Sequence, residues 1–156
     1  MITNNHIIDK SILSRSKELW VELLNTKKKI EINNTKKIYT SIQNDITIIE
    51  INKEKENIDY FLELDEIALD ENPNLFNENI YIIQYPCSQY IPQASVSYGI
   101  AKCCSDTNII HLCSTDQGSS GSPILRLATQ QVIGVHKLYS LSWNSNVGTF
   151  LRQSII

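Results

Sequence analysis

The sequence predicts an all-β fold, and three observations support this prediction. Apolar and β-branched residues gather in short runs of four to seven residues. Polar segments that contain asparagine, serine, glycine or proline separate these runs. Only one short segment, Ser11–Ser16, has the pattern of a helical turn.

The expected strands follow one another along the whole chain, beginning with a strand end at Ile2 that breaks into a polar turn before His6. The other expected strands are Leu19–Leu24, Lys29–Asn33, Lys37–Thr40, Ile46–Ile51, Ile80–Tyr85, Ser95–Ala101, Ile109–Cys113, Pro123–Leu127, Gln131–His136 and Val147–Leu151. The acidic stretch from Asn52 to Asn79 is expected to connect two β-barrels.

Composition agrees with one globular domain, because 156 residues with 42% hydrophobic and 20% charged side chains can bury a core. The net charge is −3, so the strongly basic footprint of a nucleic-acid-binding protein is absent. The run Lys27-Lys28-Lys29 and the pair Lys36-Lys37 are expected to be solvated ends of hairpins rather than a binding patch.

The four cysteines, Cys87, Cys103, Cys104 and Cys113, form no Cys-x-x-Cys pair, and we expect reduced thiols. Their spacing relative to His111 also fits no usual zinc-ligand pattern. The sequence shows no signal peptide and no long apolar segment. We therefore expect an intracellular, cytoplasmic protein without a membrane partner, with a nuclear location left open.

The segment Gly118-Ser119-Ser120-Gly121-Ser122-Pro123 can present a serine hydroxyl for attack, since glycines on both sides allow a tight turn and leave amide groups accessible. A nucleophilic serine needs a histidine to accept its proton and a carboxylate to orient that histidine. His6 follows a strand end, and Asp45 opens the apolar run Asp45–Ile51, where its carboxylate needs a partner.

The order His6, Asp45, Ser120, with intervals of 39 and 75 residues, resembles that of the trypsin-like serine peptidases, which have the chymotrypsin fold. The similarity is greatest to the compact, disulfide-free branch that includes the bacterial glutamyl endopeptidases, where an apolar strand leads to Ile-Gly-x-His. Here that segment is Ile133-Gly134-Val135-His136.

The resemblance implies a two-barrel chymotrypsin-like fold, with a first barrel in residues 1–52, a connection in 53–79 and a second barrel in 80–156. Only five residues precede His6, so we expect an incomplete first barrel.

The resemblance also implies catalysis by His6, Asp45 and Ser120, an oxyanion hole made by the amides of Gly118 and Ser120, and no cofactor or metal. Thr115 and His136 stand where glutamyl endopeptidases bind a substrate carboxylate.

Three hypotheses follow from the sequence. The first is a serine endopeptidase that acts on a protein or peptide substrate and prefers an acidic residue before the scissile bond. The second is a non-catalytic fragment or pseudoenzyme with the protease fold that serves as an interaction module. The third is an unrelated β protein.

Overall fold

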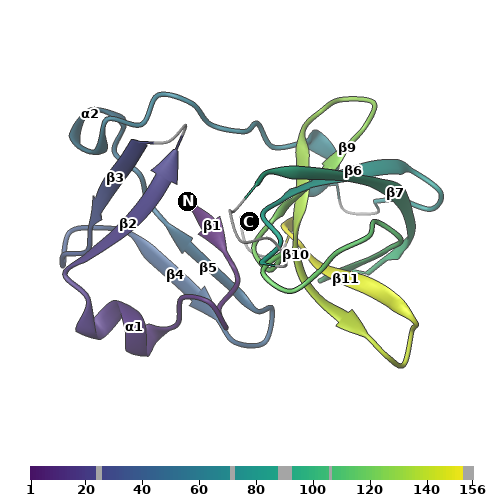
Figure 1. Cartoon of the computed structure of the whole chain (residues 1–156), viewed down its shortest axis with the longest axis horizontal. Coiled ribbons are helices and arrows are strands. Elements are labelled where there is room, and N and C mark those ends of the chain that lie inside the picture. The colour runs from purple at the N-terminus through teal and green to yellow at the C-terminus, as the bar shows by residue number, and fades with distance from the viewer. Residues whose placement is uncertain (24–25, 71–72, 88–92, 106, 153–156) are drawn as a thin grey trace. The chain divides into compact units, whose positions relative to one another are not determined.

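The computed structural model describes residues 1–23, 26–70, 73–87, 93–105 and 107–152. The chain divides into two compact units, Met1–Phe61 and Leu62–Ile156, and each is described by itself (Figure 1). The division falls inside the stretch in which the sequence predicts a connection between barrels.

The first unit contains a three-stranded antiparallel sheet in the order β1-β5-β4 and a separate two-stranded hairpin, β2-β3. Ile46 and Ile49 of the apolar β5, the central strand of this sheet, are buried. The elements are β1 (Ile2–Thr3), α1 (Lys10–Arg15), β2 (Glu18–Leu23), β3 (Thr26–Glu31), β4 (Ile38–Ser41), β5 (Ile46–Ile49) and α2 (Lys53–Glu56).

The two helices of this unit begin at residues that cap their first turn. Asp9 precedes α1, and its side chain accepts a hydrogen bond from the Ile12 amide at 2.8 Å. Asn52 does the same for α2 through the Lys55 amide at 3.0 Å. The described strands of this unit form open sheets rather than a closed ring, as an incomplete first barrel would.

The second unit contains a closed barrel of six antiparallel strands in the order β10-β11-β8-β7-β6-β9, with β9 pairing back to β10. Its elements are the 3-10 helix η1 (Glu66–Leu69) and the strands β6 (Asn79–Gln84), β7 (Ser95–Cys104), β8 (Asn108–His111), β9 (Pro123–Arg126), β10 (Val132–Ser140) and β11 (Ser145–Phe150).

Alternate residues of the barrel strands point inward, and they form one buried apolar core. Members of this core include Ile80, Ile82, Ala101, Ile109, Ile124, Ile133 and Phe150, each fully buried. The closed barrel and the open sheets confirm the mostly β, chymotrypsin-like fold that the sequence predicts.

Several predicted boundaries differ from the structure. The hairpin strand β3 begins at Thr26, so Lys27, Lys28 and Lys29 lie within it rather than at the end of a hairpin. The strand β10 continues past His136 to Ser140 and forms a long hairpin with β11 (Figure 1). Leu24, the last residue of one predicted strand, lies outside the described residues.

The prediction of a solvated Lys36 is wrong. Its side chain is 8% exposed and forms an ion pair with Glu56, whose side chain is 4% exposed. The Lys36 ammonium also donates to the Glu50 carbonyl at 3.1 Å, and the Glu56 carboxylate accepts from the Asn52 amide at 2.6 Å. Burial is possible here because each charged group has both an opposite charge and a backbone partner.

All four cysteines are free thiols. Burial raises the pKa of Cys113 to about 12, so this thiol stays protonated at neutral pH. None of the helices in the described parts of the chain is long and apolar enough to cross a membrane.

Candidate active site

The structure brings His6 and Asp45 together in the first unit. The Nδ1 atom of His6 lies 2.7 Å from Oδ2 of Asp45, and the backbone amide of His6 donates to Oδ1 of the same carboxylate at 2.9 Å. The two contacts use both carboxylate oxygens, so they fix the direction of the imidazole as well as its position. The histidine side chain is 45% exposed and the aspartate 18%, which leaves the ring accessible beside a half-buried carboxylate.

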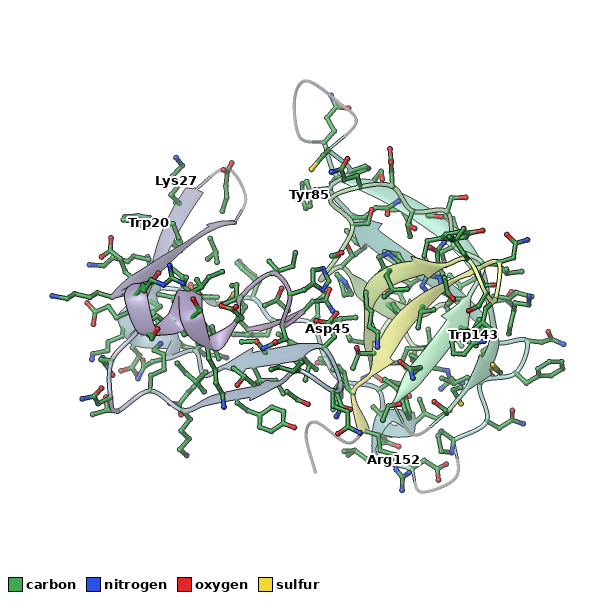
Figure 2. The ribbon with its side chains drawn as sticks, turned by 90° about the horizontal axis from the view of Figure 1, so that it is seen from below. Trp20, Lys27, Asp45, Tyr85, Trp143 and Arg152 are labelled. Atoms are coloured by element: carbon green, nitrogen blue, oxygen red, sulfur yellow. The ribbon has the colours of Figure 1, made fainter. Side chains whose placement is uncertain are left out.

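Asp45 occupies a strained backbone position at the turn between β4 and β5 (Figure 2). Its φ angle is +50°, in the left-handed region that aspartate tolerates better than most residues. The Asn4 side-chain amide donates to the Asp45 carbonyl at 3.1 Å and helps to hold this conformation. The turn thereby directs the carboxylate toward His6 instead of continuing the strand.

Buried polar residues support the His6 segment, and the sequence analysis did not identify them. Asn4, Asn5 and Thr47 are each at most 6% exposed. The Asn5 amide donates to the Thr47 hydroxyl at 3.2 Å, and that hydroxyl donates to the Ile8 carbonyl at 2.6 Å. The signal in the sequence was the Asn-Asn pair directly before His6. Buried amide side chains need hydrogen-bond partners, and the polar groups of a turn supply them.

Ser120 lies in the second unit, in the loop before β9, and Gly118 and Gly121 flank it with φ angles of +92° and +84°. These left-handed conformations require glycine and give the loop its tight turn. The Ser120 hydroxyl donates to the Lys137 carbonyl at 3.1 Å. The side chain is half-buried and is held by a backbone acceptor of β10.

The loop around Ser120 is fixed to its neighbours by hydrogen bonds. The Gly121 amide donates to the His136 carbonyl at 2.9 Å, and the His136 amide donates to the Ser122 carbonyl at 2.8 Å. The Ser119 hydroxyl is buried and accepts from the Asp116 amide at 3.2 Å. The serine is therefore presented by a loop whose shape is set on both sides.

The amides of Gly118 and Ser120 are suited to bind a negatively charged oxygen. Across the ranges that the structure describes, neither amide donates a hydrogen bond. A Cβ atom at Gly118 would lie 2.4 Å from the Cys87 sulfur, which shows how closely the loop packs on Cys87. Both amides are therefore available to donate a hydrogen bond.

Thr115 and His136, the residues expected to bind a substrate carboxylate, have different partners in the second unit. The Thr115 hydroxyl donates to Oδ1 of Asn146 at 2.8 Å, and Nδ2 of Asn146 donates to the Cys113 carbonyl at 2.7 Å. His136 is buried on β10, and its Nδ1 atom lies 3.3 Å from Nε2 of His111.

The sequence analysis assigned no role in the site to His111, which lies beside His136. It is fully buried on β8, and its ring meets His136 edge-on. Burial, with His136 as a smaller contribution, lowers the pKa of His111 from 6.5 to about 3. His111 is therefore neutral at physiological pH. The alternating burial of β8 was its only signal, because the contact with His136 depends on β11, which pairs with both β8 and β10.

The described residues contain no group of three or more histidine, cysteine or acidic side chains that could hold a metal ion. The first unit contributes an oriented imidazole, and the second contributes a serine hydroxyl on a tight glycine loop.

Residues 1–135 match the family described as the trypsin-like peptidase domain, so the chain belongs to that family. No match was found among the curated proteins.

Solved structures share this fold. Tobacco etch virus protease complexed with product matches with a TM-score of 0.66, 20% identity and coverage of 96% of this chain and 61% of that one. A Glu endopeptidase in complex with MPD matches with a TM-score of 0.69, 19% identity and coverage of 96% and 74%.

Tobacco vein mottling virus protease matches with a TM-score of 0.61, 19% identity and coverage of 96% and 64%. The chain thus spans less than two thirds of the length of the two viral proteases.

Proposed function

We propose that this protein is a serine endopeptidase that uses His6, Asp45 and Ser120. The observation that carries the proposal is the double contact between Asp45 and His6, which orients an exposed imidazole with its Nδ1 atom engaged. That arrangement leaves Nε2 as the atom to accept a proton from a nucleophile. Membership of the trypsin-like peptidase family supports the same reading.

In the proposed mechanism, the Ser120 hydroxyl turns from the Lys137 carbonyl to His6 and transfers its proton to Nε2 as the oxygen attacks a peptide carbonyl. Asp45 holds the ring in the required tautomer and stabilises the imidazolium that forms. The amides of Gly118 and Ser120 bind the oxygen that becomes negative. His6 then donates the proton to the leaving amine, and water releases the acyl group by the same steps in reverse.

The first prediction concerns covalent labelling. A fluorophosphonate probe should label the wild-type protein, and Ser120→Ala should abolish the labelling because the nucleophile is gone. His6→Ala and Asp45→Asn should each lower the rate of peptide cleavage by several orders of magnitude, since triad residues act as a unit. Gel fluorescence and a fluorogenic peptide assay measure the two effects.

Ser142→Ala is the matched control, because Ser142 is an exposed serine in the turn between β10 and β11. It should label like the wild type. Labelling of Ser120→Ala at the wild-type rate would contradict the assignment of the nucleophile. A folded wild-type protein that neither labels nor cleaves, but binds peptides, would instead favour the non-catalytic interaction module.

We further propose that the enzyme prefers an acidic residue before the scissile bond. His136 and Thr115 would bind its carboxylate, and an imidazole that meets a carboxylate gains affinity for a proton. His111 stays neutral because of its low pKa, so the proposal places the required positive charge on His136. Protein or peptide substrates with glutamate or aspartate at that position follow from this assignment.

The second prediction tests this preference with peptides that differ only in the residue before the cleaved bond. The value of kcat/KM should be about tenfold or more higher for glutamate than for glutamine, in the range that one well-placed polar group supplies. His136→Ala should remove the difference, while Thr115→Val should reduce it. A wild-type preference for aromatic or basic residues would exclude the acidic pocket without affecting the result with the probe.

A further inference from the structure

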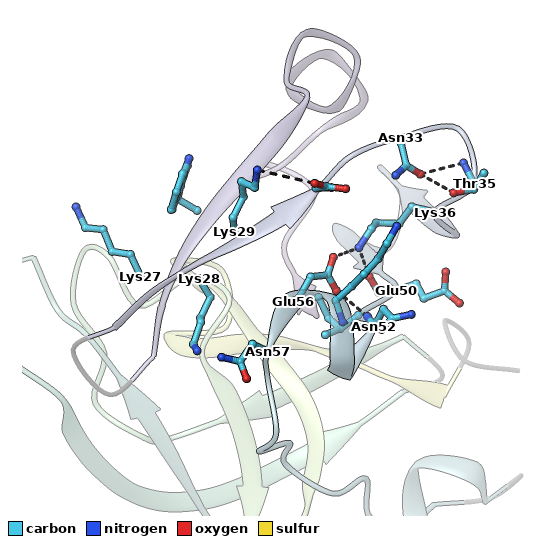
Figure 3. Close-up of a pocket in the computed structure, with 14 residues that line it drawn as sticks. Lys27, Lys28, Lys29, Asn33, Thr35, Lys36, Glu50, Asn52, Glu56 and Asn57 are labelled. Carbon is cyan, nitrogen blue, oxygen red and sulfur yellow. Dashed lines mark hydrogen bonds and ion pairs between the residues drawn. The ribbon is translucent and has the colours of Figure 1, made fainter.

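A pocket of about 640 Å³ opens in the first unit, and neither His6 nor Asp45 lines it (Figure 3). Its walls are formed by Trp20 of β2, by β3, by the turn from Asn33 to Lys36, and by the segment 50–57 that contains α2. Its volume is in the range of sites for small organic ligands. The inference below is independent of the proposed peptidase activity.

The lining contains five lysines and three glutamates, and each glutamate already has a partner within the protein. Glu56 pairs with Lys36, Glu31 lies 3.8 Å from Lys29, and Glu50 accepts from the Lys37 amide at 3.2 Å. Of these contacts, the buried ion pair of Glu56 joins two walls of the pocket, and the five lysines outnumber the three glutamates.

Lys29 and Lys36 have carboxylate partners. Within the described part of the chain, the other three lining lysines have none: Lys27, Lys28 and Lys55. Lys27 is exposed and stands opposite Glu22 in the strand register, so its charge can be screened there. Lys28 and Lys55 provide the uncompensated positive charge.

Lys28 occupies an unusual position, on the face of the hairpin that also carries buried Ile30. Its cross-strand neighbour is Val21, so no side chain directly opposite balances its charge. The residue is half-buried, and Figure 3 shows its side chain running toward Asn57. Among the described residues no carboxylate lies within ion-pair distance of Lys28, so its charge is available to an anion in the pocket.

The cations that line the pocket in the described residues are all lysines. Lysine acts as a compact charge whose donors rotate toward the oxygens of an anion, and it is a common ligand of phosphate. Asn57 adds a neutral amide donor, and Trp20, whose residue is 60% exposed, adds apolar surface to the lining.

We propose that this pocket binds a small phosphorylated molecule, with Lys28 and Lys55 supplying the charge for the phosphate and Asn57 a neutral hydrogen-bond donor. The ligand adds the counter-charge that the protein itself does not provide. No covalent step is involved.

Tryptophan fluorescence tests the proposal directly, because the chain has only two tryptophans and one of them lines the pocket. Trp143 is half-exposed on the β10–β11 turn, so Trp143→Phe leaves Trp20 as the only reporter. Titration with inorganic pyrophosphate and, separately, with ADP should change its emission and reach saturation. Calorimetric titration of the unmodified protein provides a second readout.

Lys28→Gln and Lys55→Gln should each weaken pyrophosphate binding about tenfold or more, as expected for loss of one charge-assisted hydrogen bond. Lys10→Gln on α1 is the matched control and should bind like the parent. Thermal unfolding verifies that each variant is folded, and exposed Lys55 keeps the test valid if Lys28→Gln does not fold.

Three results would overturn the proposal: no saturable binding of pyrophosphate or ADP at millimolar concentration, citrate binding as tightly as pyrophosphate, or equal weakening in Lys10→Gln. The second result would assign the pocket to carboxylates. The third would show general attraction of anions to the unit.

Discussion

The buried imidazole of His111 must stay neutral in the folded protein, and stability should depend on pH for that reason. Its pKa is about 3 in the folded state against an ordinary value of 6.5. Between these values the unfolded chain binds a proton at this site that the folded chain does not. Stability is therefore full above pH 6.5 and is lost as the pH falls through this window.

The third prediction follows from this difference. Lowering the pH from 7 to 5.5 should reduce the free energy of unfolding by about 1 kcal/mol through His111. Urea unfolding at both pH values measures the loss. His111→Gln should remove this loss of stability, whereas His6→Gln at an exposed position should retain it. An unchanged loss in His111→Gln would contradict the prediction.

At the same scale, the sequence predicted some members of the candidate site and missed others for a physical reason. His6 and Asp45 could be paired because each needs a partner that the other supplies. Gly118 could be assigned because a tight loop requires its backbone freedom. His111 could not be found, because its contact with His136 arises from strand pairing between distant segments.

At the scale of elements, the ion pair between Lys36 and Glu56 connects the turn before β4 to helix α2. Both side chains are nearly fully buried, so neither charge can be hydrated if the other is removed. Removing one partner should therefore lower the free energy of unfolding by more than the ion pair itself contributes to it.

The fourth prediction is that Lys36→Met lowers the free energy of unfolding by about 3–5 kcal/mol, because it leaves the Glu56 carboxylate buried and unpaired. The double variant Lys36→Met with Glu56→Gln should recover part of this loss, since glutamine can still accept from the Asn52 amide. Exposed Lys37→Met is the control and should change stability by less than about 0.5 kcal/mol. Chemical denaturation measures all three, and equal stability of Lys36→Met and Lys37→Met would disprove the prediction.

This ion pair also shows which features of the elements could not be predicted from the sequence. Short apolar runs located the first residues of β5 and β9, and the predicted ends lie two residues and one residue beyond the observed ones, because burial on a strand depends on local pattern. The pair Lys36-Lys37 resembled a solvated turn because Glu56 is 20 residues away in sequence. The extension of β10 to Ser140 was missed since its residues are largely exposed and are held by cross-strand pairing with β11.

At the scale of the whole molecule, the two units differ in whether their sheets close into a ring. The six strands of the second unit form a ring, so each described strand has a neighbour on both sides. The sheets of the first unit are open, so among the described residues their outer strands have a neighbouring strand on one side only.

The fifth prediction concerns hydrogen exchange. Amides of the barrel strands should exchange much more slowly than those of β2 and β3, because opening a closed ring requires breaking pairs on two sides. Mass spectrometry of peptic fragments after exchange measures this. Equal protection of the β2–β3 hairpin and the barrel would contradict it.

The closure of the ring also sets an order in which its pairs can form as the chain is made. Strand β11 pairs with both β10 and β8, and it is the last strand of the barrel in sequence. Until Phe150 has been synthesised, β8 and β10 each retain an open edge, whereas the pairs of β1, β4 and β5 need only the first 49 residues. Contacts between distant segments form slowly, because the loop between them must close first. The loop that carries Ser120 makes its amide contacts to β10, so it can assemble only after that strand, Val132–Ser140, has been synthesised, long after β1.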